Sequence, residues 1–124
     1  MNNWAATGRL VKDPEINITD SGMTIVKITV AIKREFKNKK TNEYDSDFFT
    51  YKSLSNTDSL SNTVKYIGDF LHKGDLVELI SKVENNNYEK DGEKVWNNDY
   101  IIKSISKLMS SRKNEESKDN TNNF

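Results

Sequence analysis

The sequence predicts an all-β domain in which five strands are interrupted by one helix, placed between the third and fourth strands. Segment 24–36 alternates between apolar and polar residues at period two, which is the pattern of a half-buried strand. The apolar positions on one of its faces are Val26, Ile28, Val30 and Ile32. Segment 59–73 instead repeats its apolar residues every three or four positions, as one face of a helix does. These helical positions are Leu60, Val64, Ile67 and Leu71.

Turn-forming residues separate the remaining elements. Pro14 ends the first strand because proline cannot donate to a β-ladder, and Asp20, Ser21 and Gly22 form a turn signal. Gly74 is suited to end the helix, and the Lys-Asp-Gly-Glu segment 90–93 is a hairpin signal. The predicted strands are residues 4–11, 24–36, 44–54, 76–88 and 95–108.

This order of elements matches an OB-fold, a partly open Greek-key barrel of five strands. OB-folds often bind single strands of nucleic acid on one face. Other small barrels and α+β domains share the same order, so the order alone does not select among them.

Composition predicts one folded domain followed by a polar tail. The chain has 124 residues, of which 34% are hydrophobic and 31% are charged. The length suits a single core. After Leu108 there is almost nothing to bury, which is typical of disorder. The prediction is a domain over residues 1–108 and a disordered tail over residues 109–124.

Cysteine is absent, which excludes disulfides, thiolate metal sites and cysteine nucleophiles. No apolar run approaches the roughly 20 residues that span a bilayer, and the first ten residues lack the apolar segment of a signal peptide. We expect a cytoplasmic protein without a cofactor or metal.

The segment Ile25–Lys40 combines a strand pattern with local positive charge. Residues 27–40 hold six basic residues against one acid, Glu35, although the formal net charge of the chain is zero. Phe36 lies within this basic run. Lysine and arginine beside an exposed ring suit a groove for unpaired nucleic acid, with charge for phosphates and a ring for a base.

Several segments together resemble the successive landmarks of bacterial and phage single-stranded DNA-binding proteins. They are GRLVKDPEI, SGMTIVKITVAIKREFKN, DFF, DFLHKGD and NNNYEKDGEKVW, in family order between Asn2 and about Leu108. The resemblance implies an OB-fold that binds single-stranded DNA without catalysis and protects it during replication, recombination and repair. It also implies self-association as a tetramer or dimer. We expect the chain to be a phage-encoded or divergent member of that family.

The resemblance also implies residue roles. The aromatic positions that match base-stacking positions are Phe36, Phe48, Tyr88 and Trp96. The cations at or beside strand-facing positions are Arg9, Lys33, Arg34, Lys37, Lys52 and Lys82. Trp96 is expected across the hairpin from Tyr88, and the alternative role of these two rings is a cross-strand pair that stabilises the hairpin.

The chain departs from the family pattern at two kinds of position. Leu54 lies near a position where the family commonly has another stacking ring, and Asn86 lies where a basic residue is usual. Family tails usually end in an acidic peptide with a terminal phenylalanine that recruits partner enzymes. Here Phe124 is terminal but NTNNF has no acid, which puts recruitment of replication or recombination proteins through the tail in doubt.

Some aromatic residues also have a structural interpretation. Phe36 shares strand parity with Val26, so a core or interface ring is the alternative for it. Phe48 and Phe49 lie on opposite faces of a regular strand, and the family register selects Phe48 as the exposed one. Trp4 is expected in the core or in a subunit interface.

Three other functions are alternatives to single-stranded DNA binding. An OB-type RNA-binding protein would use the same rings, and a protein-interaction module would leave the basic run unexplained. A nuclease would need a metal, and Glu43, Asp45 and Asp47 are the acids that alternation gathers on one face. No second cluster, general base or nucleophile motif accompanies them, so we expect a solvated strand edge and no enzyme.

Overall fold

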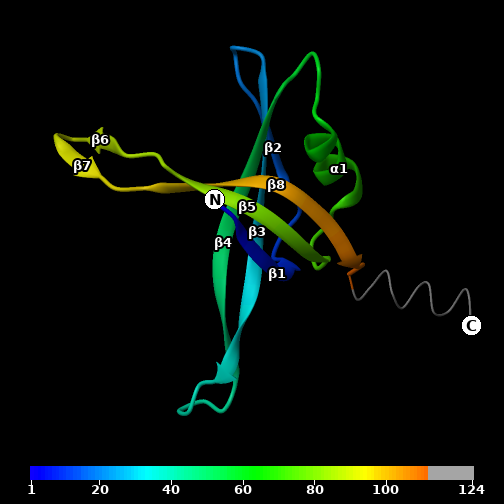
Figure 1. The fold of residues 1–124 in the computed structure, drawn as a ribbon, viewed down its shortest axis with the longest axis vertical. Coiled ribbons are helices and arrows are strands. Elements are labelled where there is room, and N and C mark those ends of the chain that lie inside the picture. Colours follow the sequence, from blue (N-terminus) through cyan, green and yellow to red (C-terminus); the bar gives the residue numbers. More distant parts are fainter. Residues whose placement is uncertain (112–124) are drawn as a thin grey trace, which may run out of the picture.

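Five strands of one sheet form a barrel (Figure 1). The structure is a computed structural model, and it describes residues 1–111. The strands β1 (Trp4–Leu10), β5 (Leu76–Asn85), β8 (Asn98–Met109), β4 (Tyr44–Asn56) and β3 (Met23–Lys37) are neighbours in that order. An additional pairing of β1 with β3 closes the barrel. The other elements are β2 (Glu15–Ile18), α1 (Asn62–Phe70), β6 (Tyr88–Lys90) and β7 (Glu93–Val95). The predicted all-β barrel, with its helix between the third and fourth barrel strands, is confirmed.

Alternation along the strands fills the barrel. The register places Ile28 of β3 opposite Tyr51 of β4 and Val30 opposite Phe49. Ile28, Val30 and Tyr51 are at most 1% exposed, and Lys27 between the apolar positions is exposed. The core consists of Leu10, Val26, Ile28, Val30, Tyr51, Val64, Ile67, Leu71, Val77, Leu79 and Ile102.

The barrel closes where β1 crosses β3. Arg9 and Leu10 pair with Ala31 and Val30 there. A Cβ atom at Gly8 would collide with the carbonyl oxygen of Ala31, so only glycine allows the two backbones to approach this closely.

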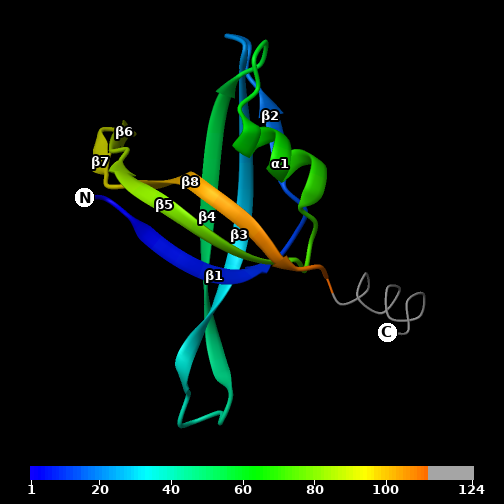
Figure 2. The same ribbon diagram turned by 45° about the vertical axis from the view of Figure 1, so that its right-hand side comes forward.

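Helix α1 packs against β3, β4 and β8 (Figure 2). Ser61 caps its N-terminus, because the Ser61 hydroxyl accepts the Val64 N–H at 3.2 Å. The predicted helix of residues 59–73 is too long, since the chain is already extended at Leu71. The N–H groups of His72 and Lys73 donate to the carboxylates of Asp75 and Asp13, both at 2.8 Å. These bonds replace the helical hydrogen bonds that would have continued the helix.

The structure corrects two other strand predictions. β2 was missed because it has only four residues directly after Pro14, and it pairs with β3 from Glu15 opposite Lys27 to Ile18 opposite Thr24. The predicted strands 76–88 and 95–108 are too long at the ends that face each other. Residues 88–95 instead form the separate two-stranded sheet β6–β7.

Two hairpins extend away from the barrel in different directions (Figures 1 and 2). We call residues 33–46 the β3–β4 arm and residues 86–97 the β6–β7 hairpin. The predicted hairpin at residues 90–93 is confirmed, because Lys90 pairs with Glu93 and the intervening Asp91 and Gly92 have φ angles of 54° and 80°. Positive φ at both positions is the geometry of a type I′ turn.

The last described strand, β8, ends at Met109, and the predicted tail of residues 109–124 lies mostly outside the described residues. The domain boundary at residue 108 therefore stays a prediction. No helix of the described chain has both the length and the apolar character that crossing a membrane requires.

Candidate nucleic-acid interface

The strands β3 and β4 present a polar outer face opposite the core. Residues that are directly paired in an antiparallel sheet project to the same side. We define the outer face by these paired residues: Lys27 with Lys52, Thr29 with Thr50, Ala31 with Phe48, Lys33 with Ser46, and Lys37 with Tyr44. Arg9 of β1 is paired with Ala31 and joins this face. Four of the predicted binding residues, Lys33, Lys37, Phe48 and Lys52, thus share one face with Arg9.

Lys82 lies on the same side of the barrel. Both Lys82 of β5 and Lys52 of β4 are paired with Ile101 of β8, which runs between them. Arg34, in contrast, reaches Asp47, and the register partner of Asp47 is Ile32, which packs against the core. The Arg34 and Asp47 side chains therefore lie on the opposite face of the β3–β4 arm.

The two neighbouring phenylalanines of β4 separate as predicted. Phe48 is 63% exposed on the outer face. Phe49 packs against the core and meets Trp4 edge to face at a centroid distance of 4.8 Å. Trp4 also contacts Tyr51 and Tyr100, so it belongs to an aromatic cluster of the core.

Phe36 is 82% exposed, so its alternative as a core ring of this chain is wrong. The pairing of β3 with β4 shifts between Lys33 and Lys37, where β3 carries more residues than β4. A bulge of this kind interrupts the ladder and redirects side chains. The ring stays exposed despite the parity that it shares with Val26, because every residue of β3 from Lys33 to Lys37 lies beyond the core in the β3–β4 arm.

The β6–β7 hairpin carries the other two predicted rings. Tyr88 is 48% exposed and Trp96 is 72% exposed. Trp96 lies on the other side of the hairpin from Tyr88 but is not its direct partner, because Val95 pairs with Tyr88 and β7 ends there. The ammonium of Lys94 lies 4.4 Å from the Trp96 ring centroid, within the range of a cation–π interaction.

Most of the predicted cations already have intramolecular partners. Arg34 donates two hydrogen bonds to Asp47 Oδ1 and one to Oδ2, at 2.8 to 3.2 Å. This contact lowers the pKa of Asp47 and raises the pKa of Arg34, through hydrogen bonding first and charge attraction in addition. Lys52 and Lys82 form ion pairs of 2.9 Å with Asp99 and Glu84. Arg9 donates to the Gly74 carbonyl at 2.8 Å.

Lys33 and Lys37 differ from those cations. Neither forms an ion pair with a carboxylate among residues 1–111. Their ammonium groups lie 5.1 and 5.7 Å from the centroid of the Tyr44 ring. Tyr44 was not singled out from the sequence, although it shares strand parity with Phe48 on β4 and this parity was the available signal.

A hollow of about 160 Å³ extends the outer face toward β8. Its lining includes Lys27, Thr50 and Lys52 of the outer face, together with Asn98, Asp99 and Tyr100 of β8. Lys27 and Asp99 were not predicted as site residues. The sequence contains no local signal for Asp99, because its ion pair with Lys52 joins strands that are far apart in the chain.

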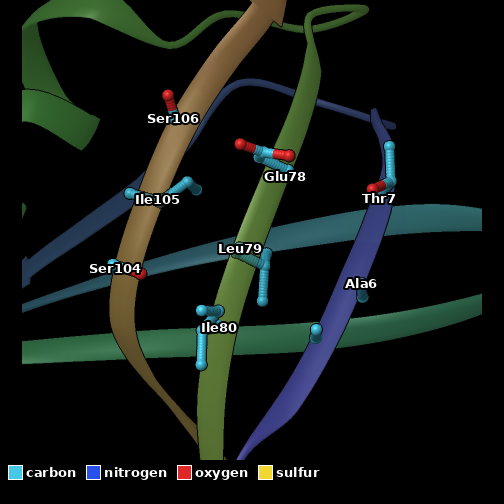
Figure 3. Close-up of a pocket in the computed structure, with 9 residues that line it drawn as sticks. Ala6, Thr7, Glu78, Leu79, Ile80, Ser104, Ile105 and Ser106 are labelled. Atoms are coloured by element: carbon cyan, nitrogen blue, oxygen red, sulfur yellow. The ribbon is translucent and has the colours of Figure 1, made fainter.

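A larger hollow of about 400 Å³ lies over β1, β5 and β8 (Figure 3). Ala6, Leu79, Ile80 and Ile105 contribute apolar side chains to it, and Glu78 is its one charged lining residue. It contains none of the predicted binding residues. The charge and the rings are therefore concentrated on the outer face and the two hairpins, not in this hollow.

Two of the three acids that raised the metal-site alternative have side-chain partners on the β3–β4 arm. Asp45 accepts a hydrogen bond from Asn38 at 3.0 Å, and Asp47 is bound by Arg34. In the part of the chain that the structure describes, no three acidic or histidine side chains gather in a way that could hold a metal ion.

Comparison with known proteins decides the family. Residues 1–108 match the sequence profile of the Single-strand binding protein family. The chain belongs to this family. Single-stranded DNA-binding protein 3 of Listeria innocua is 32% identical over 111 residues, which cover 89% of this chain and 65% of that protein. Single-stranded DNA-binding protein 1 of Staphylococcus aureus is 29% identical over 120 residues, which cover 96% of this chain and 72% of that protein.

The fold agrees with this family membership. The crystal structure of a single-stranded DNA-binding protein from Thermus aquaticus superposes with a TM-score of 0.68 at 23% identity. The match covers 87% of this chain and half of the Thermus chain. The five-stranded barrel of this family member is therefore the OB-fold predicted from the order of its elements.

Proposed function

We propose that this family member binds single-stranded DNA without sequence preference. In this proposal successive bases stack on Phe36, Phe48, Tyr88 and Trp96. The phosphates are contacted by Arg9, Lys33, Lys37, Lys52 and Lys82, and by Arg34 from the opposite face of the β3–β4 arm. The observation that carries the proposal is an exposed Phe48 ring on the same face as Lys33 and Lys37, two lysines that form no ion pair with a carboxylate of residues 1–111.

The energies are sufficient for binding that tolerates any sequence. Each base stacked on a ring contributes about 1 to 3 kcal/mol, so even three of the four rings supply roughly 3 to 9 kcal/mol before ordering costs. Every base has a face that can stack, which is why this mode selects strandedness and not sequence. A duplex binds poorly in this scheme because its bases are already stacked on one another.

The wider role that fits this activity is protection of single strands during replication, recombination and repair in the cytoplasm of a bacterial cell or a phage-infected host. We further propose that the chain works as a homo-oligomer, a dimer or tetramer, and that replication or recombination proteins act beside it. Sedimentation equilibrium of the full chain measures the oligomeric state, and a monomer at every concentration would contradict self-association.

Tryptophan fluorescence tests the binding proposal. Trp96 is 72% exposed, whereas Trp4 is packed among core rings, so quenching by bound strands should come from Trp96. The titration compares dT oligomers, rU oligomers and duplex DNA at several salt concentrations. We expect quenching by dT that weakens as salt rises, because each neutralised phosphate adds about 0.7 to the slope of log affinity against log salt.

The controls separate the alternatives. The Trp96→Phe variant should lose the quenching while it still binds labelled dT oligomers in an anisotropy assay. Tighter binding of rU than of dT would favour an RNA-binding protein instead. No binding of either strand by anisotropy would contradict the proposal.

A further inference from the structure

Tyr44 occupies a defined place on the outer face of β3–β4. It is 46% exposed and paired with Lys37, the last pair before the tip of the β3–β4 arm. Four residues along the same strand separate it from Phe48, which is about 13 Å in a β-strand. Lys33 is paired with Ser46, which lies midway between the two rings. The Tyr44 ring, the Lys33 side chain and the Phe48 ring therefore follow one another along a single face.

Hydrogen bonds within the tip hold Tyr44 in this position. The Asn38 side chain accepts the N–H of Lys40 at 2.9 Å and donates to Asp45 at 3.0 Å. The backbone N–H of Asn38 donates to the carbonyl of Glu43 at 2.8 Å. The chain directly before Tyr44 is thus fixed to the end of β3, and the ring needs little further ordering to receive a ligand.

The two lysines nearest Tyr44 form no ion pair within the described residues. Lys33 and Lys37 place their ammonium groups within 6 Å of the ring centroid, and neither pairs with a carboxylate among residues 1–111. Arg34, Lys52 and Lys82 are all paired with acids. The same arrangement of a lysine against an exposed ring recurs at Lys94 and Trp96 on the other hairpin.

We propose that Tyr44, Lys33 and Lys37 form an additional nucleotide subsite at the end of the β3–β4 arm. The inference rests on the proposed single-strand binding and extends its path beyond Phe48. The Tyr44 ring takes a base, and the two ammonium groups take the phosphates beside it. A stacked strand rises about 3.4 Å per nucleotide, so the 13 Å to Phe48 is crossed by about four nucleotides at most.

The alternative is that the two lysines and Tyr44 only stabilise the arm. Three substitutions distinguish the roles. Tyr44→Ala removes the ring, Tyr44→Phe keeps the ring without its hydroxyl, and Phe70→Ala is the matched control, since Phe70 is 57% exposed but lies on α1, away from the outer face. Binding of labelled dT oligomers of increasing length is measured by anisotropy, with circular dichroism as a check on folding.

The subsite predicts a loss that depends on strand length. Tyr44→Ala should weaken binding of long oligomers about five-fold or more while short oligomers bind nearly as they do to the wild type. Tyr44→Phe and Phe70→Ala should stay within about two-fold of the wild type at every length, because the one keeps the stacking ring and the other lies off the path. If Tyr44→Ala fails to fold, Tyr44→Leu repeats the comparison with an apolar side chain retained in the strand.

The outcomes are separable from those of the proposed function. A wild-type chain that binds dT, with Tyr44→Ala equal to it at all lengths, overturns the subsite alone. An equal loss in Tyr44→Phe and Tyr44→Ala also overturns it, since the hydroxyl and not the ring would then matter. A wild-type chain that binds no single strand overturns the proposed function and the subsite with it.

Discussion

The two hairpins that leave the barrel carry similar side chains on different supports. The β3–β4 arm continues the longest ladder of the barrel, and it presents Tyr44 with two lysines beside the outer face. The β6–β7 hairpin has strands of only three residues, in a sheet of its own, and presents Trp96 with Lys94. A small two-stranded hairpin is only marginally stable by itself.

This difference teaches that equally exposed rings need not contribute equally to binding. Phe48 is held by strands that are anchored in the core on both sides, so a base meets a ring that is already in place. Ordering a flexible segment costs about 1 to 2 kcal/mol per residue, and this cost is subtracted from whatever the hairpin rings gain on binding. We therefore expect the arm and the outer face to dominate the affinity.

The largest effect should come from the ring on the rigid support. Phe48→Ala is expected to weaken binding of dT oligomers by about 1 to 3 kcal/mol, roughly five- to 150-fold in Kd. Trp96→Ala should lose less, because part of its stacking energy is spent on ordering the hairpin. Anisotropy titrations of both variants under one salt condition measure the difference. Equal losses would show that the two supports do not differ in the way we infer.

A turn substitution probes the hairpin without touching its rings. Gly92 has φ of 80°, so Gly92→Ala places a Cβ where L-residues are strained by about 1 to 2 kcal/mol. We expect a several-fold loss of dT affinity, smaller than that of Phe48→Ala. Gly68→Ala is the matched control, because a Cβ there meets only the Ile16 side chain at an ordinary 3.6 Å. Unchanged affinity in Gly92→Ala would mean that the hairpin takes no part in binding.

A smaller effect, of opposite sign, should follow from releasing a cation on the β3–β4 arm. Asp47→Asn removes the carboxylate that binds Arg34, so Arg34 becomes available to a phosphate. Affinity should rise a few-fold, and the salt slope should steepen by about 0.7 for one added phosphate contact. The control is Asp69→Asn, an acid on α1 that forms no ion pair within residues 1–111. An unchanged slope would show that Arg34 does not reach the strand.

The pKa of Asp47 gives this prediction a pH dependence. Because Arg34 lowers the pKa of Asp47, the pair stabilises the folded arm at pH values above the ordinary 3.8, and the contribution is lost as the pH falls through the lower folded value. The difference in unfolding temperature between the wild type and Asp47→Asn should therefore shrink below about pH 4. Both side chains are exposed, so we expect the difference to be small even at neutral pH.

Local patterns predicted the elements better than the contacts between them. Alternation over residues 24–36 was long enough to define β3, whereas the family register was needed to select Phe48 and not Phe49 as the exposed ring. The end of α1 was misplaced because it depends on Asp13, which is 60 residues from its partner Lys73. The pairing of Lys52 with Asp99 likewise joins separate strands, so the sequence could not show that this predicted cation is already compensated. Tyr44 was missed because the resemblance, not strand parity, selected the candidate rings.

A final substitution should change stability and leave both hairpins unaffected. Tyr51 is fully buried in the core, and its hydroxyl has no hydrogen-bond partner among residues 1–111. Tyr51→Phe should raise the free energy of unfolding by about 1 kcal/mol, because a buried unsatisfied hydroxyl is removed.

Burial raises the pKa of Tyr51 to about 12 from 10.0, so the folded state favours the neutral hydroxyl. The wild type should lose stability as the pH rises from 10 toward 12, because Tyr51 ionises more readily in the unfolded chain, and Tyr51→Phe should lose none by this route. Thermal unfolding against pH measures the stability. A changed dT affinity in Tyr51→Phe would contradict the separation of the core from the binding face, since only the core has been altered.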